Sequence, residues 1–362
     1  MKRQWLWNFV LWPYWNIADI DQQPHSVDEF LSFDPILPNI TIFATGGTFA
    51  GDGPASKTTG YNAGVLNVTN IIVEIPGIFG VANVRLVQYA KQDSINAKSE
   101  QDYGLSIAVQ IELKRPTTQG VVVITGTDTL EERACFLDLT VMSEKPVIIT
   151  GSSRPHTAAI YDGRMNLLTA VVAAGDKSAR DRGVIVVFSD RILSPRHATK
   201  INSNQLDLFE AGDAGNLGTF VNVLPIFYFP ASRPLGHQHF DITKISPDAE
   251  WPRVLMAYGH QDPATAVFIP PDIQGLVLVG LGAGYWPSVQ VEEMRKTLNG
   301  NDIPVVVCSR VTWGSVSAHN IDFGIGAGFL GPPKALVLLR LCERMGLSLN
   351  EIKAIFEHYG IH

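Results

Sequence analysis

Short apolar runs that alternate with helical stretches constrain the fold of this chain more than any other feature. Short continuous apolar runs are typical of parallel strands that are buried on both faces. Strands are predicted at residues 40–44, 121–124, 147–149, 184–188, 254–257, 276–279 and 305–307, and helices at residues 129–142, 162–174 and 291–298, with two more within residues 333–359. This alternation predicts an α/β fold with a mostly parallel sheet.

Two domains are expected, since 362 residues suffice for two buried cores. A segment rich in Pro, His, Ser and Asp, which includes Pro230, Pro234 and Pro247, predicts a linker between them. The predicted division is an N-terminal extension at residues 1–36, a large N-terminal catalytic domain at residues 37–229, the linker at residues 230–250 and a smaller C-terminal α/β domain at residues 251–362.

The N-terminal extension begins with the basic run Met1-Lys2-Arg3 and continues with a tryptophan-rich apolar stretch. This order loosely resembles a signal peptide, although Asn8 and Pro13 interrupt the apolar stretch and no small-residue cleavage site is clear. The alternative is an extension that packs on the fold or stays disordered. If residues 1–36 are not a signal, the protein is expected in the cytoplasm.

Charge and cysteine content exclude several classes of partner. A net charge of −7 without a basic cluster argues against nucleic acid and anionic membranes. No apolar run reaches the roughly 18 residues of a membrane span. Cys135, Cys308 and Cys342 show neither a CxxC spacing nor an accompanying His cluster, so a zinc site and a disulfide framework are not expected, whereas buried structural thiols are.

Polar residues follow the predicted strands at their carboxyl ends, where open parallel sheets bind ligands. The first strand runs into Ala44-Thr45-Gly46-Gly47-Thr48, in which two glycines allow a tight turn and a close backbone approach before a hydroxyl. The alternative is a plain strand-to-helix turn. The glycine spacing does not match GxGxxG, so a dinucleotide site is not supported.

Two further polar segments complete the candidate site. The strand at residues 121–124 runs into Thr127 and Asp128, and Lys200 follows a later strand. Taken alone, Asp128 would be a helix cap and Lys200 a surface charge. Because a threonine hydroxyl is a weak nucleophile, it needs a base or an electrostatic partner. Thr127 is predicted to relay a proton, Lys200 to lower the pKa of that hydroxyl, and Asp128 to hold the lysine and a substrate ammonium group.

These motifs resemble the bacterial-type L-asparaginases, nearest to their secreted or periplasmic (type II-like) branch and its fungal relatives. The resemblance covers about residues 39–362. It rests on the ATGGT-A-G signature at residues 44–51, the TGTDT-EE signature at residues 125–132, Lys145-Pro146, residues 151–155, Asp162-Gly163, Asn166-Leu167, and Thr199-Lys200 with Asn202.

The resemblance implies the two-domain asparaginase fold and hydrolysis of a side-chain amide, in which L-asparagine gives L-aspartate and ammonia. It implies Thr48 as the nucleophile that forms an acyl-enzyme, and Tyr61 as its proton acceptor or donor, on a loop that closes over the site. Thr127, Asp128 and Lys200 form the second catalytic set.

For the substrate, the resemblance implies contacts with Gly47, Ser94, Thr127 and Asp128, with Ser94 holding the α-carboxylate. The alternative for Ser94 is a helix cap, and both roles are compatible because helix N-termini bind carboxylates. It implies neither a metal nor a cofactor, and a homotetramer built as a dimer of dimers. A secreted, cell-wall or vacuolar location also follows from the resemblance.

Three positions depart from the family pattern around the substrate amino group. Ile95 stands where Gln is common, Tyr285 where a neighbouring subunit commonly lends Asn or Ser, and Ile321 where Glu is placed, with Asp322 beside it. Each lost charged hydrogen bond costs about 1.5–3 kcal/mol. We therefore hypothesise weakened recognition of the amino group.

The sequence also leaves alternatives to an L-asparaginase open. An L-asparaginase could itself have glutaminase side activity. One alternative is an asparaginase-like protein with little catalysis that binds a small amino acid or a partner, consistent with the altered shell and with Trp5, Trp7, Trp12 and Trp15 near the start. Another is an amidase for a different small amide. A tRNA-amidating subunit is set aside because it needs an additional nucleic-acid-binding region.

Overall fold

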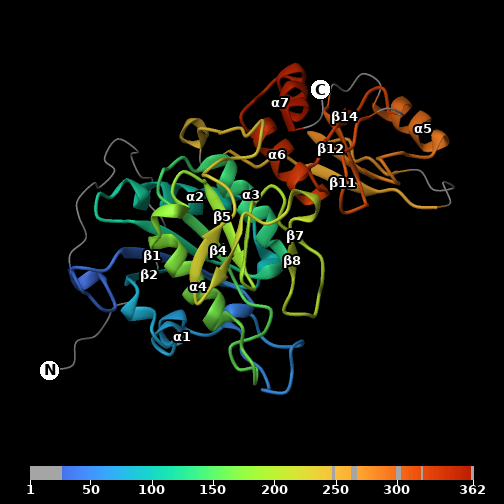
Figure 1. Ribbon diagram of the computed structural model, residues 1–362. Helices are drawn as coiled ribbons and strands as arrows, with labels where there is room; N and C mark the ends of the chain where they lie inside the picture. Colours follow the sequence, from blue (N-terminus) through green and yellow to red (C-terminus); the bar gives the residue numbers. More distant parts are fainter. Residues whose placement is uncertain (1–26, 247–248, 262–266, 299–302, 319–320, 360–362) are drawn as a thin grey trace.

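The computed structural model describes residues 27–246, 249–261, 267–298, 303–318 and 321–359, which form two lobes (Figure 1). One lobe contains the elements from β1 to β10 and the other contains the elements from β11 to α7. The tryptophan-rich N-terminal stretch lies outside the described residues, so both interpretations of it remain predictions. Within the described residues, no helix is long and apolar enough to cross a membrane.

The N-terminal lobe is built on an eight-stranded mixed sheet with the order β10-β9-β6-β5-β4-β3-β1-β2. Its strands are β1 (Asn39–Gly46), β2 (Asn83–Gln92), β3 (Gly120–Ile124), β4 (Val147–Thr150), β5 (Val184–Phe188), β6 (Arg191–Leu193), β9 (Gly218–Val221) and β10 (Leu224–Phe227). Strands β1 to β5 pair in parallel, whereas β6, β9 and β10 pair antiparallel. The four strands predicted in this lobe are confirmed.

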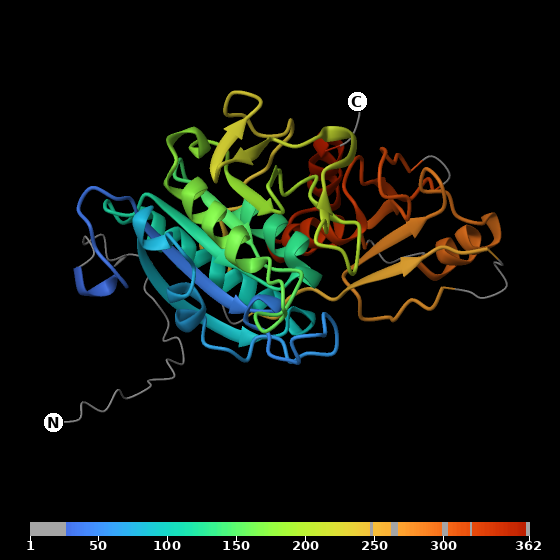
Figure 2. The same ribbon diagram turned by 60° about the horizontal axis from the view of Figure 1, so that its bottom comes forward.

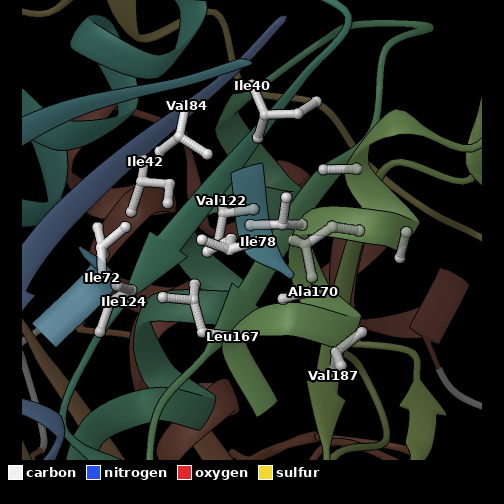
Figure 3. Close-up of a cluster of buried hydrophobic side chains, with 14 of the residues drawn as sticks. Ile40, Ile42, Ile72, Ile78, Val84, Val122, Ile124, Leu167, Ala170 and Val187 are labelled. Carbon is white, nitrogen blue, oxygen red and sulfur yellow. The ribbon is translucent and has the colours of Figure 1, made fainter. Parts of the chain in front are cut away.

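Helices cover both faces of this sheet. Figure 3 shows one face, where Val122 and Ile124 of β3 lie with Leu167 and Ala170 of α4 in a fully buried apolar cluster. The opposite face packs against α2 and α3. The helices of this lobe are α1 (Val68–Val73), α2 (Ser99–Lys114), α3 (Leu130–Thr140) and α4 (Gly163–Gly175). The helices predicted at residues 129–142 and 162–174 are confirmed.

The C-terminal lobe has a four-stranded parallel sheet with the order β11-β12-β13-β14. Its elements are β11 (Val254–Tyr258), β12 (Gly275–Gly280), β13 (Val305–Ser309), β14 (Ile325–Gly326), α5 (Ser288–Leu298), α6 (Pro332–Arg344) and α7 (Leu349–Tyr359). Figure 2 shows the red helical segment between the orange strands of this lobe and the green helices of the other. The strands and helices predicted here are confirmed.

The segment between the lobes packs against both of them. Phe240, Ile242 and Ile245 are buried in one apolar cluster with Phe136 of α3 and with residues of the C-terminal sheet. A short helix, η9 (Ile242–Lys244), forms within it. The expected division of the chain at residues 230–250 remains a prediction.

Candidate active site

The glycine pair after β1 brings its turn against the turn that follows β3. Gly47 has a φ of +74°, and a Cβ at this position would lie 2.2 Å from the Cα of Gly126, so a side chain is excluded by conformation and by space. The N–H of Gly47 donates to the carbonyl of Gln92 at 2.8 Å. The predicted contact between Gly47 and the substrate therefore depends on the absence of a side chain, which lets the backbone come close. The short helix η3 (Thr48–Ala50) follows at once.

Thr48 and Tyr61 form the first polar pair of the site. Thr48 is buried, and its Oγ1 lies 2.7 Å from the Tyr61 hydroxyl. The backbones of Asp52 and Asn62 exchange two hydrogen bonds across the loop that carries Tyr61. The Tyr61 ring rests on Gly51, where a Cβ would lie 3.0 Å from the ring carbon Cδ2. The loop thus holds the phenol against the threonine hydroxyl.

Lys200 joins the second polar set. Thr127 and Asp128 lie in η6 (Thr127–Thr129), directly after β3. Lys200 lies in β7 (Thr199–Lys200), which pairs with β8 (Phe209–Glu210). Its Nζ donates to Thr127 Oγ1 at 3.0 Å and to Asp128 Oδ1 at 2.5 Å. The Asp128 side chain is 53% exposed, so its carboxylate remains accessible to a ligand.

The electrostatics of Tyr61 connect the two polar sets. Burial raises the pKa of Tyr61 above its usual 10, the hydrogen bond with Thr48 lowers it, and the nearby carboxylates of Asp128, Asp93 and Asp162 raise it. The Asp128 carboxylate of the second polar set therefore lies close enough to the Tyr61 phenol to raise its pKa. The phenol is neutral at physiological pH, so it begins as a hydrogen-bond partner rather than as a phenolate.

Ser94 lies beside the turn that follows β3. It is buried in η5 (Ser94–Asn96), and a Cβ on Gly126 would lie 2.4 Å from its Oγ. Ser94 does not cap α2, because that helix begins at Ser99 with Lys98 as its N-cap residue. The alternative of a helix cap is therefore wrong, and the side chain is placed next to the turn that carries Thr127.

Among the described residues, the positions that depart from the family pattern present no unpaired carboxylate in place of the family's amino-group ligands. Ile95 is 66% exposed and Tyr285 is 50% exposed. Ile321 is fully buried in the C-terminal lobe. The neighbouring Asp322 forms an ion pair with Arg295 at 2.7 Å. Asp322 is thus engaged with its own lobe.

Asp162 and Asn166, which belong to the family motifs, brace the loop after β4. The Asp162 carboxylate accepts hydrogen bonds from the N–H groups of Ser153 at 2.8 Å and Arg154 at 3.0 Å. The Asn166 amide donates to Asp162 Oδ2 and to the carbonyl of Gly151, both at 3.1 Å. Their role in the structure is to shape this loop.

Sequence reasoning missed two buried cations that adjoin the site, Arg133 and Lys334. Arg133 donates to the hydroxyls of Thr45 and Thr125, and Lys334 of α6 donates to the hydroxyl of Thr199. In the sequence Arg133 follows two glutamates and Lys334 follows two prolines, and charged residues near the start of a helix usually indicate a solvated face. No signal in the sequence distinguishes them from surface charges.

Metal and thiol chemistry find no support in the described residues. No group of three or more His, Cys, Asp or Glu side chains among them is arranged to hold a metal ion. Cys135, Cys308 and Cys342 are free and buried, as predicted. Burial raises the pKa of Cys135 and of Cys342 to about 12, so neither thiol is a nucleophile at neutral pH.

The fold and this group of hydroxyl, carboxylate and ammonium groups define a two-domain α/β enzyme. Residues 39–231 match the family "Asparaginase, N-terminal", and residues 253–356 match "Glutaminase/Asparaginase C-terminal domain". The chain belongs to the L-asparaginase family and is an amidohydrolase of that type. The expected family, fold and enzyme class are confirmed.

Individual relatives resemble the chain over most of its length. It is 37% identical over 335 residues to a probable L-asparaginase 3 of Schizosaccharomyces pombe, covering 91% of this chain and 92% of that protein. It is 38% identical over 326 residues to L-asparaginase 2-3 of Saccharomyces cerevisiae, covering 88% and 90%. A probable cytoplasmic L-asparaginase structure from Campylobacter jejuni superimposes with a TM-score of 0.81 at 35% identity, covering 89% of this chain and 100% of that one.

Proposed function

We propose that the protein hydrolyses L-asparagine to L-aspartate and ammonia, with Thr48 as the nucleophile. The observation that carries this proposal is the 2.7 Å contact between Thr48 Oγ1 and the Tyr61 hydroxyl, beside a lysine that bonds Thr127 and Asp128. A hydroxyl nucleophile with a proton partner and a nearby cation is the arrangement that acyl transfer requires. The names of the relatives, which are L-asparaginases, support the choice of substrate.

In the proposed acylation step, Thr48 Oγ1 forms a bond to the side-chain amide carbon of the substrate. The Thr48 proton passes to the Tyr61 oxygen, which hands on its own proton toward the leaving amine. The tetrahedral intermediate then expels ammonia and leaves an ester on Thr48. Lys200 stabilises negative charge on the Thr127 side, where its Nζ lies 3.0 Å from Thr127 Oγ1.

In the proposed deacylation step, water attacks the ester carbon. Thr127, which is held by Lys200, takes one proton from that water while its own hydroxyl proton passes by way of Tyr61 to Thr48 Oγ1, which leaves as a hydroxyl. L-aspartate is released and the hydroxyl nucleophile is restored. No metal or cofactor enters either step.

We propose that Ser94, Gly47 and Asp128 position the substrate, with Ser94 on its α-carboxylate and Asp128 on its ammonium group. Since Ile321 is buried and Asp322 is paired with Arg295, Asp128 is the carboxylate of this chain assigned to the amino group. We expect a KM for free L-asparagine well above the micromolar range. A submicromolar KM would contradict this expectation.

A second candidate function is a small-amino-acid-binding protein with little catalysis, which the apolar residues Ile95 and Ile321 favour. For the assembly we propose a homotetramer formed as a dimer of dimers, to be checked by light scattering. For the location we propose secretion, the cell wall or the vacuole if residues 1–36 direct export, and the cytoplasm otherwise.

The test is ammonia release from millimolar L-asparagine and, separately, from L-glutamine. The wild-type chain is expected to release ammonia, and Thr48→Ala is expected to abolish release. Thr58→Ala removes an exposed hydroxyl from the loop that carries Tyr61 and serves as the control. Release by Thr48→Ala at the wild-type rate would reject Thr48 as the nucleophile, and no release by the wild-type chain would favour the binding protein.

A further inference from the structure

One buried guanidinium contacts three segments at the base of the site. Arg133 of α3 is 3% exposed, and its Nη1 donates to Thr45 Oγ1 at 2.8 Å and to Thr125 Oγ1 at 2.5 Å. Its Nε donates to Asp102 Oδ1 of α2 at 2.6 Å. The described contacts therefore join the ends of two strands and the start of a helix through a single planar group.

Each of the three partners lies just before or after a residue of the proposed mechanism. Thr45 precedes Thr48 by three residues, and Thr125 directly precedes the turn with Thr127 and Asp128. Asp102 lies in the first turn of α2, which follows Ser94 after a short connection. The guanidinium thus reaches every segment that supplies a group to the acylation step except those of Tyr61 and Lys200.

The strand pairing alone does not hold these turns together. The parallel register between β1 and β3 ends at the pair Ala44 and Ile124, one residue before the two threonines. Beyond that pair, β1 continues beside β2 to the pair Gly46 and Gln92, and the N–H of Thr125 donates to the carbonyl of Thr150 in β4. Besides Arg133, the hydroxyl of Thr45 links β1 to β3 here, because it donates to the carbonyl of Ile124 at 3.0 Å. The Arg133 side chain bridges the two strands at the residue where the pairing stops.

We propose that Arg133 is a positioning residue, which sets the separation between the Thr48 turn and the Thr127–Asp128 turn and anchors the Ser94 segment through Asp102. This inference rests on the proposed function. The guanidinium suits the task because its donors have a fixed planar geometry. A displacement of about 1 Å between reacting groups costs roughly 100-fold in rate. A variant that loosens this bridge is therefore expected to have a lower kcat.

Variants on the two sides of the Arg133 guanidinium are expected to change different kinetic constants. Arg133→Lys keeps a cation beside Asp102 but loses the Nη1 group that reaches both threonines, so kcat should fall at least tenfold while KM stays within threefold. Asp102→Ala keeps the contacts to Thr45 and Thr125 but releases the Ser94 segment, so KM should rise at least threefold while kcat stays within threefold. Because loss of folded protein lowers the apparent kcat and leaves KM unchanged, kcat is expressed per folded enzyme, and the rise in KM of Asp102→Ala cannot come from such a loss.

Matched controls separate positioning from stability. Arg182 is another buried arginine, whose donors bind the carbonyls of Ser178, Phe229 and Pro230, so Arg182→Lys should lower Tm without lowering kcat per folded enzyme. If Arg133→Lys does not fold, Thr125→Val removes one partner of the guanidinium without a change of charge, against Thr150→Val, which removes from the neighbouring strand a buried hydroxyl that has no hydrogen-bond partner among the described residues. Thr125→Val should lower kcat at least threefold and Thr150→Val should not.

All variants are assayed beside the wild-type chain and Thr48→Ala for ammonia release and for Tm. If wild-type release depends on Thr48 and both Arg133→Lys and Thr125→Val keep wild-type kcat, the role of Arg133 is rejected and the proposed function stands. If kcat and KM change together in both the Arg133 and the Asp102 variants, the positioning role is also rejected. A wild-type chain without ammonia release rejects the proposed function and the inference with it.

Discussion

Glu132 is a buried carboxyl group whose ionisation opposes folding. One of its oxygens, Oε2, is buried without a hydrogen-bond partner. Burial, chiefly, and the neighbouring Glu131 carboxylate raise its pKa from 4.5 to about 7. Because the folded carboxyl keeps its proton to a higher pH than the unfolded one, the free energy of unfolding falls as the pH rises from about 4.5 to about 7.

Glu132→Gln removes this penalty and is expected to raise the free energy of unfolding at pH 8 by up to about 3 kcal/mol. The gain should shrink as the pH falls and vanish near pH 4.5. Chemical denaturation across this pH range measures it. Glu357→Gln is the control, since that side chain is 58% exposed. A gain that does not depend on pH would show that the carboxyl ionises normally in the folded protein.

At the scale of the elements, helix α3, which follows the turn with Thr127 and Asp128, is packed against both lobes. All its residues from Arg133 to Thr140 are buried. Leu130, Ala134 and Leu137 pack on the N-terminal sheet, whereas Phe136 and Leu139 pack in the apolar cluster of the C-terminal lobe. The helix is therefore enclosed on two sides, and it begins two residues after Asp128.

The turn before α3 offers a test of the close approach to Ser94. Gly126 has a φ of −73°, which any residue adopts, but a Cβ would lie 2.4 Å from Ser94 Oγ. Gly126→Ala is thus expected to displace Ser94 and raise the KM for L-asparagine at least tenfold, about 1.4 kcal/mol or more. Steady-state kinetics measure this. Gly80→Ala is the control, because a Cβ there meets open space, and equal KM values for the two variants would remove Ser94 from the substrate site.

The same elements show how far the sequence pattern predicts this fold. The strands β1, β3, β4 and β5 are buried on both faces, so their continuous apolar runs were sufficient to predict them. The edge strand β2 is mostly half-buried and polar, and the short antiparallel strands β9 and β10 alternate between buried and more accessible residues. Their pairing depends on tertiary contacts that no local run of residues indicates.

The sequence pattern likewise predicts only part of the candidate site. Thr48, Thr127 and Asp128 follow predicted strands, so their proximity follows from the parallel sheet. Tyr61 lies on a loop and Ser94 in the short helix η5, and only the family resemblance indicated them. Arg133 and Lys334 carry no sequence signal, because only the packing of helices on both sides buries their charges.

At the scale of the whole molecule, one buried ion pair connects the two lobes behind the site. Lys334 of α6 is 1% exposed, and its Nζ lies 2.7 Å from Glu131 Oε2 of α3 and 3.0 Å from Thr199 Oγ1 of β7. Thr199 directly precedes Lys200, and successive side chains of a strand point to opposite faces. The C-terminal lobe therefore holds the strand that carries Lys200 from the face opposite to Asp128.

Breaking this pair from one side is expected to be costly, because a charge would remain buried without its partner. Lys334→Met leaves the Glu131 carboxylate, whose side chain is 12% exposed, and should lower the free energy of unfolding by about 3–5 kcal/mol. The double variant Lys334→Met with Glu131→Gln removes both charges and should regain most of that loss. Denaturant unfolding measures all three proteins, with Lys353→Met as the control, since Lys353 is 60% exposed beside Glu357 and should change stability by less than about 0.5 kcal/mol. If Lys334→Met is as stable as Lys353→Met, the ion pair does not hold the lobes together. If the double variant is no more stable than Lys334→Met, the loss of stability comes from packing rather than from the uncompensated charge.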